Sequence, residues 1–271
     1  MFDPKTNFGQ LLFATTLIEC RKPGDIISYG TAFVFDYEVE PGRDFPLLVT
    51  CGHTVTDSIT GGYAFTVQGP DDGSGKRSLQ LGKRVSIQFE DFSQSWFFHP
   101  DPNVDVAVQP LVPVIQRFQE AGYDPYTNSI PLSMCPSHAA LGIVDVHEQV
   151  VFVGYPYGLQ DERHSLPLVR TGFTASSFHI CYNGLPGFYV DGHFHPGSSG
   201  SPVCIIDKLF ATRQDGAATY VERGLLLGLA TSADKAPSGD FEDAEIGLGF
   251  VTSSDMIVET SELYLKSLGI I

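Results

Sequence analysis

The sequence has 271 residues and a formal net charge of −16. A strongly acidic surface repels the phosphates of nucleic acids and of anionic membranes, so neither is expected as a partner. Hydrophobic residues make up 42% of the chain and charged residues 18%, which is typical of a globular protein and not of a disordered one. The 28 glycines, the 18 prolines and the short apolar runs predict an all-β protein with many turns.

The cysteines and the N-terminal residues bear on the compartment and on metal binding. The first residues lack the basic and apolar regions of a signal peptide, and no apolar run approaches the roughly 18 residues of a membrane helix. The 5 cysteines are odd in number, widely spread and without a C-x-x-C pair. We therefore expect a cytoplasmic protein without a disulfide framework, a bound metal or a cofactor, in which most cysteines are buried as small hydrophobic residues.

The first half of the chain predicts five strands and one helix. The expected strands cover residues 11–20, 28–35, 46–50, 63–67 and 83–89, where β-branched and aromatic residues gather. The apolar spacing of residues 111–121, followed by Gly122, predicts a helix. The loop from about 122 to 145 is expected to separate an N-terminal domain, 1–125, from a C-terminal domain, 126–271.

The second half is again dense in predicted strands and ends in a predicted helix. The strands are expected at residues 148–153, 167–176, 178–183, 187–190, 202–206, 218–221, 224–232 and 247–251. Residues 254–269 carry apolar side chains at helical spacing and are expected to pack on a barrel.

Residues 191–203 form a polar, glycine-rich turn between two strand-like runs. The glycines around its serines allow backbone shapes that other residues disfavour. Such a turn can direct backbone N–H groups to one point beside the Ser199 hydroxyl, which is what an acyl-transfer nucleophile needs. The alternative is a plain hairpin loop rich in Gly, Ser and Pro, and the presence of suitable partners upstream favours the nucleophile.

Two upstream residues are candidate partners of Ser199. His53 follows the predicted strand 46–50, and a strand end can hold an imidazole at the edge of a cleft. Asp105 begins the apolar run Asp-Val-Ala-Val, so its carboxylate needs a hydrogen-bonded partner at the border of the core in order to stay charged. The alternatives are a core or surface histidine and a solvated turn aspartate, and Asp101 is the competing acid.

At these residues the chain resembles the trypsin-like, chymotrypsin-fold serine endopeptidases, in particular the bacterial Deg/HtrA-type and glutamyl-endopeptidase branches. His53, Asp105 and Ser199 stand in this order in the contexts Thr-Cys-Gly-His-Thr-Val, Asp-Val-Ala-Val and Pro-Gly-Ser-Ser-Gly-Ser-Pro. Further motif matches follow in the family's order at residues 30–33, 151–159, 191–197, 228–231 and 247–250. The resemblance implies two six-stranded antiparallel β-barrels with the active site between them and a C-terminal helix.

The resemblance also implies a role for each site residue. Ser199 would attack the peptide carbonyl and form an acyl-enzyme, while His53 would take its proton and pass it to the leaving amine. Asp105 would orient the imidazole. The backbone N–H groups of Gly197 and Ser199, assisted by Ser198, would form the oxyanion hole.

The specificity pocket is placed by alignment with the family. Its expected lining residues are His193, Phe194, His195, Thr231, Ser232 and Ala233. No aspartate stands at the expected base, so a Lys/Arg preference is not expected. Phe194 would make the pocket shallow and suit a small apolar residue, which we favour, whereas protonated His193 or His195 would favour an acidic one. His193 and His195 could also be read as a pair of metal ligands, but no third ligand is apparent. The resemblance further implies that Thr231 supports Asp105.

Two other functions compete with the endopeptidase. An α/β-hydrolase needs Gly-x-Ser-x-Gly between a strand and a helix, but Ser201 holds the fifth position here and Pro202 follows it. A catalytically latent or inactive trypsin-like scaffold, acting as a binding or regulatory module, remains the alternative. We therefore expect a regulated serine endopeptidase that acts on protein or peptide substrates, with a regulatory partner protein as a further expectation.

Overall fold

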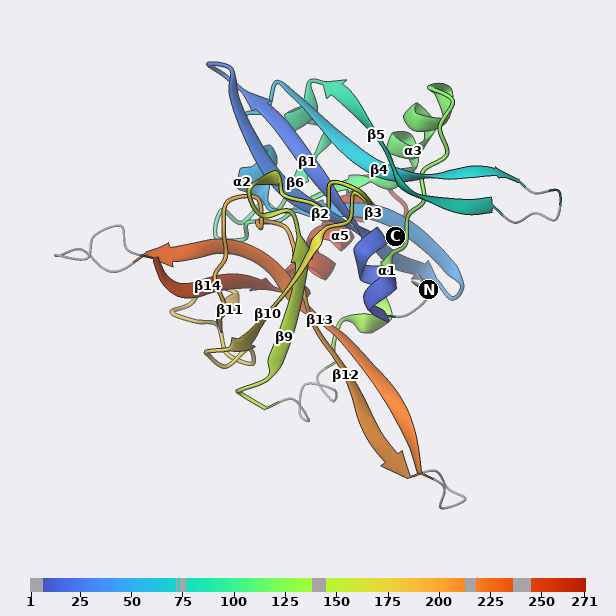
Figure 1. The fold of residues 1–271 in the computed structure, drawn as a ribbon. Coiled ribbons are helices and arrows are strands. Elements are labelled where there is room, and N and C mark those ends of the chain that lie inside the picture. Colours follow the sequence, from blue (N-terminus) through green and yellow to red (C-terminus); the bar gives the residue numbers. More distant parts are fainter. Residues whose placement is uncertain (1–6, 72, 74–76, 138–144, 213–217, 236–244) are drawn as a thin grey trace.

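The computed structural model describes residues 7–71, 73, 77–137, 145–212, 218–235 and 245–271. Strands dominate it, as the glycines, prolines and short apolar runs predicted. A sheet built from the first half of the chain packs against a closed barrel built from the second half, and the helix α5, Ser254–Ser267, follows the last strand (Figure 1). The predicted all-β fold class with a C-terminal helix is confirmed.

The first half forms one sheet around the long strand β2, Ile26–Glu40. Its hydrogen-bonded order is β5-β4-β1-β2-β3-β7-β6, and β8 adds to β2 in parallel. The other strands of this sheet are β1, Thr15–Lys22; β3, Arg43–Thr50; β4, Thr60–Asp71; β5, Arg77–Glu90; β6, Phe97–Phe98; β7, Ala107–Pro110; and β8, Ile130–Pro131. Strands β6 and β8 have only two residues each, so six longer strands make up most of this eight-stranded sheet.

Short helices fill the corners of the first half. They are α1, Asn7–Ala14; α2, Gly52–Val55; η1, Phe92–Ser95; α3, Leu111–Glu120; and η2, Leu132–Met134. Helix α3 matches the helix predicted at 111–121. Residues 11–14 belong to α1 and not to the strand expected at 11–20, because a short apolar run does not separate helix from strand. In the described part of the chain, no helix combines the length and the apolar character that crossing a membrane requires.

The second half closes into a barrel of six antiparallel strands, in the order β10-β11-β14-β13-β12-β9. These strands are β9, Gln149–Gly154; β10, Leu168–Thr174; β11, Gly187–Asp191; β12, Pro202–Thr212; β13, Ala218–Lys235; and β14, Glu245–Ser253. The short helix η3, Pro156–Gly158, follows β9. Strands β12 and β13 continue into a long hairpin that projects from the barrel (Figure 1), so the runs predicted at 218–221 and 224–232 belong to one strand.

One predicted strand of the second half is absent from the structure. Residues 178–183 form turns and a single bridge between Tyr182 and Leu185 instead of a strand. The positive φ angles of Asn183 and Gly184, 51° and 81°, bend the chain into a tight turn at this point. The aromatic and apolar run therefore lies in a loop, from which Phe178 packs against Phe188 of β11.

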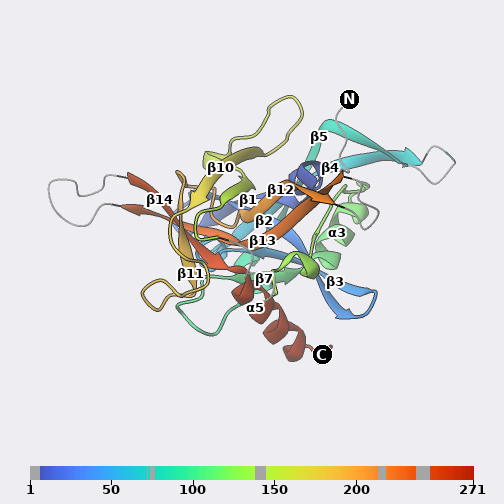
Figure 2. The ribbon, with the colours of Figure 1, turned by 90° about the horizontal axis from the view of Figure 1, so that it is seen from below.

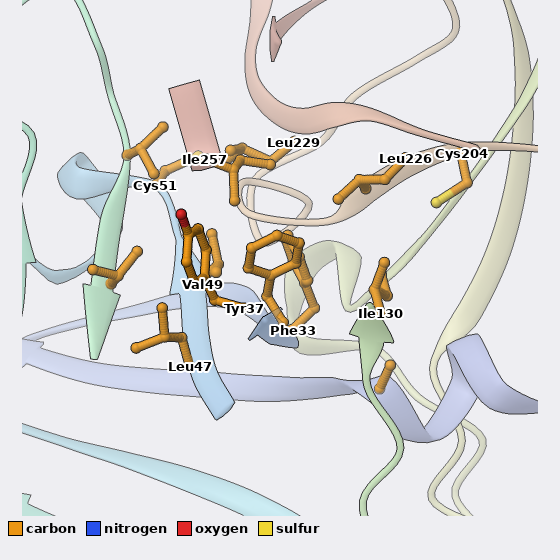
Figure 3. Close-up of a cluster of buried hydrophobic side chains, with 14 of the residues drawn as sticks. Phe33, Tyr37, Leu47, Val49, Cys51, Ile130, Cys204, Leu226, Leu229 and Ile257 are labelled. Carbon is orange, nitrogen blue, oxygen red and sulfur yellow. The ribbon is translucent and has the colours of Figure 1, made fainter. Parts of the chain in front are cut away.

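A hydrophobic cluster joins the two halves. Figure 3 shows Phe33 and Val49 of the first sheet together with Leu226 and Leu229 of β13 and Ile257 of α5. Helix α5 lies against β13, β14 and β7, so it contacts both halves of the chain (Figure 2). Because interiors are close-packed, this shared cluster fixes the facing edges of the sheet and the barrel relative to each other. We call this border between the sheet and the barrel the seam. His53, Asp105 and Ser199 lie along it.

Candidate active site

The pairing of β3 with β7 places His53 and Asp105 side by side. Thr50, the last residue of β3, pairs with Ala107, the first residue of β7. His53 stands three positions beyond Thr50 on α2, and Asp105 stands two positions before Ala107. In an antiparallel pair, the residues that follow one strand end meet those that precede its partner at the same edge of the sheet. The register therefore brings both side chains to one edge.

Asp105 holds His53 through both its backbone and its ring. The Asp105 Oδ2 atom lies 2.5 Å from His53 Nδ1, and Oδ1 accepts a hydrogen bond of 2.9 Å from the His53 backbone N–H. Burial raises the pKa of Asp105, but the hydrogen bonds and the charge of His53 outweigh it, so the pKa lies below its usual value. An ionised carboxylate only accepts hydrogen bonds, so Nδ1 carries the ring proton and Nε2 is left as an acceptor.

Gly52 allows this close approach. A Cβ atom at Gly52 would stand 3.0 Å from Asp105 Oδ1, which is tighter than ordinary van der Waals contact. The backbone N–H of Gly52 also lowers the pKa of Asp105. Gly52 therefore leaves room for the Asp105 carboxylate and helps to keep it ionised, in addition to its place in the turn from β3 into α2.

Ser199 lies in the turn that leads into β12, between two glycines with positive φ. Gly197 has φ +90° and Gly200 has φ +86°, angles that side chains with a Cβ atom disfavour. A Cβ atom at Gly200 would overlap the backbone oxygen of Thr31 across the seam. The Gly200 N–H donates 2.8 Å to the backbone oxygen of Ala230 in β13. The turn is thus held by both halves.

The Ser199 hydroxyl completes a chain of hydrogen bonds across the seam. Its Oγ atom lies 3.0 Å from His53 Nε2, the nitrogen that the Asp105 contact leaves free to accept a proton. The same hydroxyl lies 3.2 Å from the backbone oxygen of Thr231. The histidine side chain is 51% exposed, so the reactive edge of this group faces solvent. The structure brings His53, Asp105 and Ser199 together from three separate segments.

Two backbone N–H groups of the turn that carries Ser199 are candidate oxyanion donors. Within the described part of the chain, the N–H groups of Gly197 and Ser199 donate to no acceptor. The Ser198 N–H, by contrast, donates 2.8 Å to the backbone oxygen of His195 and closes the turn. Of the three residues expected at the oxyanion hole, the backbone therefore leaves two donors available for a ligand.

The predicted pocket residues do not all face solvent. His193 is exposed and stands near Gly247, where a Cβ atom would lie 3.4 Å from its ring. Phe194 is only 3% exposed and packs edge-on against Phe152 inside the barrel, with ring centroids 4.9 Å apart. It therefore lies in the barrel core and not on an open pocket wall, because alternating residues of an extended segment point to opposite sides. His195 stacks on Tyr157 at 5.4 Å.

Thr231 has different partners from the one expected. Its hydroxyl pairs with that of Thr252 at 2.7 Å and with the backbone oxygen of Leu229, and neither bond reaches Asp105. Ser232 and Ala233 continue strand β13 in pairing with β14. Asp101, the competing acid, accepts hydrogen bonds from Asn103 within its own loop.

One group of side chains is close enough to share a metal ion. Among the described residues, Cys51, His53 and Asp105 offer ligand atoms within 4.8 Å of one another. Burial raises the pKa of the Cys51 thiol well above its usual value, and the thiol donates to the backbone oxygen of Ala230. A neutral, hydrogen-bonded thiol is a poor metal ligand, because the thiolate is the form that binds. We therefore do not assign a metal ion to Cys51, His53 and Asp105. The contacts of His53 with Asp105 and Ser199 suit proton transfer instead.

Sequence reasoning missed Thr31 of β2. The Thr31 N–H donates 2.9 Å to the backbone oxygen of Ser199, and its hydroxyl donates 2.9 Å to that of Gly197. The motif Gly-Thr-Ala-Phe at 30–33 signalled the strand but not this contact, because a buried threonine in a strand is common on packing grounds alone.

A pocket of about 480 Å³ opens beside His53 and Asp105. Its other lining residues include Lys22, Asp57, Phe98 and Pro102. The Lys22 ammonium donates 2.9 Å to the backbone oxygen of His53. This pocket, which His53 and Asp105 line and Ser199 does not, has room for a side chain of a bound ligand.

No family model matches the chain, and no curated protein matches its sequence. Solved structures do share its fold. The HtrA-type protease AlgW with a tripeptide is 16% identical over 95% of this chain and 62% of that chain, with a TM-score of 0.51. The chain thus spans less than two thirds of that protease. HL collagenase is 14% identical over 97% of this chain and 96% of that chain, also with a TM-score of 0.51. The chain therefore has the trypsin-like, chymotrypsin-type fold that its sequence resemblance implied.

Proposed function

We propose that this chain is a serine endopeptidase in which Ser199, His53 and Asp105 cleave peptide bonds through an acyl-enzyme. The observation that carries the proposal is the unbroken series of contacts from Asp105 to His53, at 2.5 Å, and from His53 to Ser199, at 3.0 Å. A nucleophile within hydrogen-bond reach of a base that a third group orients is the arrangement that activates a hydroxyl.

In the first step, the Ser199 Oγ attacks the carbonyl carbon of the substrate, and its proton moves to His53 Nε2. Asp105 keeps the ring proton on Nδ1 and stabilises the imidazolium that forms. The depressed pKa of Asp105 supports this role, because the carboxylate has to remain ionised beside the imidazolium. His53 then gives the proton to the leaving amine, and the acyl group stays on Ser199.

The N–H groups of Gly197 and Ser199 are the proposed donors to the oxyanion. They lack acceptors in the described structure and belong to the turn that carries the hydroxyl, so they are available as negative charge develops on the carbonyl oxygen. Loss of one such donor lowers kcat by about 10²- to 10³-fold in other acyl-transfer enzymes.

In the second step, water replaces the leaving amine. His53 takes a proton from the water, whose oxygen attacks the acyl carbon. As the bond from this carbon to Ser199 Oγ breaks, His53 gives the proton to Oγ, and the acid product leaves. None of these steps requires a metal or an organic cofactor. The two structural neighbours are both proteases by name, and one holds a tripeptide, which supports a peptide substrate here as well.

The residue preference and the location of this proposed enzyme stay predictions. Phe194 is buried in the barrel, so we assign the exposed part of the pocket wall to His193 and His195. The cytoplasmic location and the regulatory partner likewise remain to be tested.

Labelling with a fluorophosphonate probe tests the proposal, because the probe reacts only with an activated serine. We expect the wild-type protein to be labelled, and mass spectrometry of the labelled peptide to place the adduct on Ser199. Ser199→Ala and His53→Ala should both reduce labelling by at least about 10⁴-fold.

Circular dichroism on all three proteins controls for folding. Labelling that persists in Ser199→Ala, or an adduct on another serine, would contradict the site assignment. A folded wild-type protein that does not react would favour the latent or inactive scaffold.

A further inference from the structure

Thr31 joins the first sheet to the turn that carries Ser199. It lies on β2, is 0% exposed and makes four hydrogen bonds. Its N–H donates 2.9 Å to the Ser199 oxygen, and its backbone oxygen accepts 2.6 Å from the Thr50 hydroxyl. Its own hydroxyl contacts Gly197 and Tyr155. One buried side chain therefore touches the turn and the chain segment that follows β9.

The direction of each bond to the Thr31 hydroxyl is fixed. The Tyr155 N–H donates 3.1 Å to Thr31 Oγ1, so at this contact the hydroxyl is the acceptor. A hydroxyl has one proton, and this proton is left for the Gly197 oxygen at 2.9 Å. The Thr31 side chain thus holds the peptide between Gly197 and Ser198 on its carbonyl side.

The peptide on the other side of Gly197 is held as well. The Tyr157 N–H donates 2.5 Å to the Pro196 oxygen. Because this peptide is trans, the Gly197 N–H points away from Tyr157. Tyr157 makes the bond with a φ of +53°, a left-handed conformation that residues with a Cβ atom seldom adopt.

We propose that Thr31 is a positioning residue, whose hydroxyl fixes the direction of the Gly197 N–H as an oxyanion donor. The inference rests on the proposed function. Gly197 has no side chain to restrain it, so the peptides on its two sides depend on hydrogen bonds for their orientation. Within the turn, the Ser198 N–H donates 2.8 Å to the His195 oxygen, and the other bonds described above come from Thr31 and Tyr157. Thr31 binds the Gly197–Ser198 peptide directly, through the Gly197 oxygen. Thr31 also accepts from the Tyr155 N–H, and Tyr157, two residues further on, binds the Pro196–Gly197 peptide.

The experiment compares Thr31→Val with Thr31→Ser and with Thr16→Val. Valine keeps the shape of threonine without the hydroxyl, and serine restores the hydroxyl. Thr16 of β1 is a matched control, because it is also 0% exposed and its hydroxyl also both donates to a backbone oxygen and accepts from a backbone N–H. Both groups belong to Ala64, at 2.8 Å and 3.3 Å, and the Leu17 oxygen lies 3.4 Å away. Thr16→Val therefore removes equivalent buried bonds away from the Ser199 turn.

The measurement is the rate of fluorophosphonate labelling at saturating and at limiting probe, at a temperature where all the variants are folded. We expect Thr31→Val to lower the saturated rate by about 10- to 100-fold with little change in the half-saturating concentration, because a misplaced donor weakens the transition state. Thr31→Ser and Thr16→Val should stay within about threefold of wild type.

A saturated rate in Thr31→Val equal to that of wild type, or lowered no more than in Thr16→Val, would overturn the inference and leave the proposed function standing. A failure of serine to rescue the rate would also overturn it. A folded wild-type protein that does not react would instead refute the proposed function, and the inference with it.

Discussion

The two halves of the molecule supply the candidate site by different means. The first half contributes side chains: the imidazole of His53 and the carboxylate of Asp105, brought together by the register of β3 and β7. The second half contributes a backbone shape: the turn around Ser199, with two glycines at positive φ and two N–H groups that donate to no acceptor among the residues that the structure describes. Only the serine hydroxyl is side-chain chemistry there.

This difference predicts which substitutions each half tolerates. In the first half, an isosteric change of one functional atom should remove activity while the fold remains. In the second half, a single methyl group added at Gly197 or Gly200 should lower both activity and stability. The space around these residues and their positive φ angles suit only glycine. The predictions below test this contrast.

Asp105→Asn should give the largest effect on activity with the least effect on the fold. The amide presents a donor where His53 Nδ1 also donates, so the ring is no longer held in the required tautomer. We expect kcat for peptide hydrolysis to fall by about 10⁴-fold. The control is Asp101→Asn, since the carboxylate of Asp101 accepts its hydrogen bonds from Asn103 in its own loop and not from His53. Equal losses in both variants would contradict the assignment of the acid.

Gly197→Ala should reduce activity by about 10²- to 10³-fold and also lower stability. The added Cβ atom would overlap the Tyr155 oxygen and stand 2.8 Å from the Tyr157 nitrogen, in addition to the cost of φ +90°. Gly42→Ala is the matched control, because Gly42 has φ +76° with nothing within 4 Å of a Cβ atom. Denaturant unfolding should show a loss of about 1–2 kcal/mol for Gly42→Ala and a larger loss for Gly197→Ala. Identical losses would mean that φ alone explains the glycine.

The pH dependence of stability distinguishes two carboxylates of the first half, Asp105 and Asp36. We expect it to be the smallest of the three effects. The pKa of Asp105 is lowered in the folded state, so its stabilising contribution is present above the ordinary value of 3.8 and is lost as the pH falls through the folded pKa. Burial raises the pKa of Asp36, with the Ser129 hydroxyl opposing it, so the contribution of Asp36 is favourable in acid and is lost as the pH rises.

The free energies of unfolding of Asp105→Asn and Asp36→Asn, each compared with wild type between pH 3 and 6, should therefore show opposite slopes. The advantage of wild type over Asp105→Asn should grow with pH, and that over Asp36→Asn should shrink. Slopes of the same sign would show that one of the two environments is wrongly described.

The sequence predicted the architecture well where hydrophobic periodicity was long. The helix at 111–121 and the terminal helix were predicted within a few residues of α3 and α5. Residues 11–14 and 178–183 were misassigned, because short apolar runs fit more than one structure and the turn at Asn183 and Gly184 decides the second case. The 125/126 domain boundary stays a prediction, and β8 beyond it pairs with β2.

For the site, the sequence predicted residue types in local motifs, and the structure brings His53, Asp105 and Ser199 within hydrogen-bond distance. What the sequence could not predict was the direction of individual groups. The burial of Phe194, the pairing of Thr231 with Thr252 and the contacts of Thr31 depend on strands that meet only in three dimensions. No local pattern encodes such pairings.

The distance in sequence between the parts of the site affects when it can form. The His53–Ser199 contact joins residues 146 positions apart, and the Thr31–Gly197 contact joins residues 166 positions apart. Contacts of such long range form slowly, since a large loop has to close before they are made. During synthesis, the first sheet can collapse long before Ser199 has left the ribosome. For the proposed endopeptidase, catalysis therefore begins only after the turn that carries Ser199 has been made and has docked on the first sheet, which protects the nascent chain from its own chemistry.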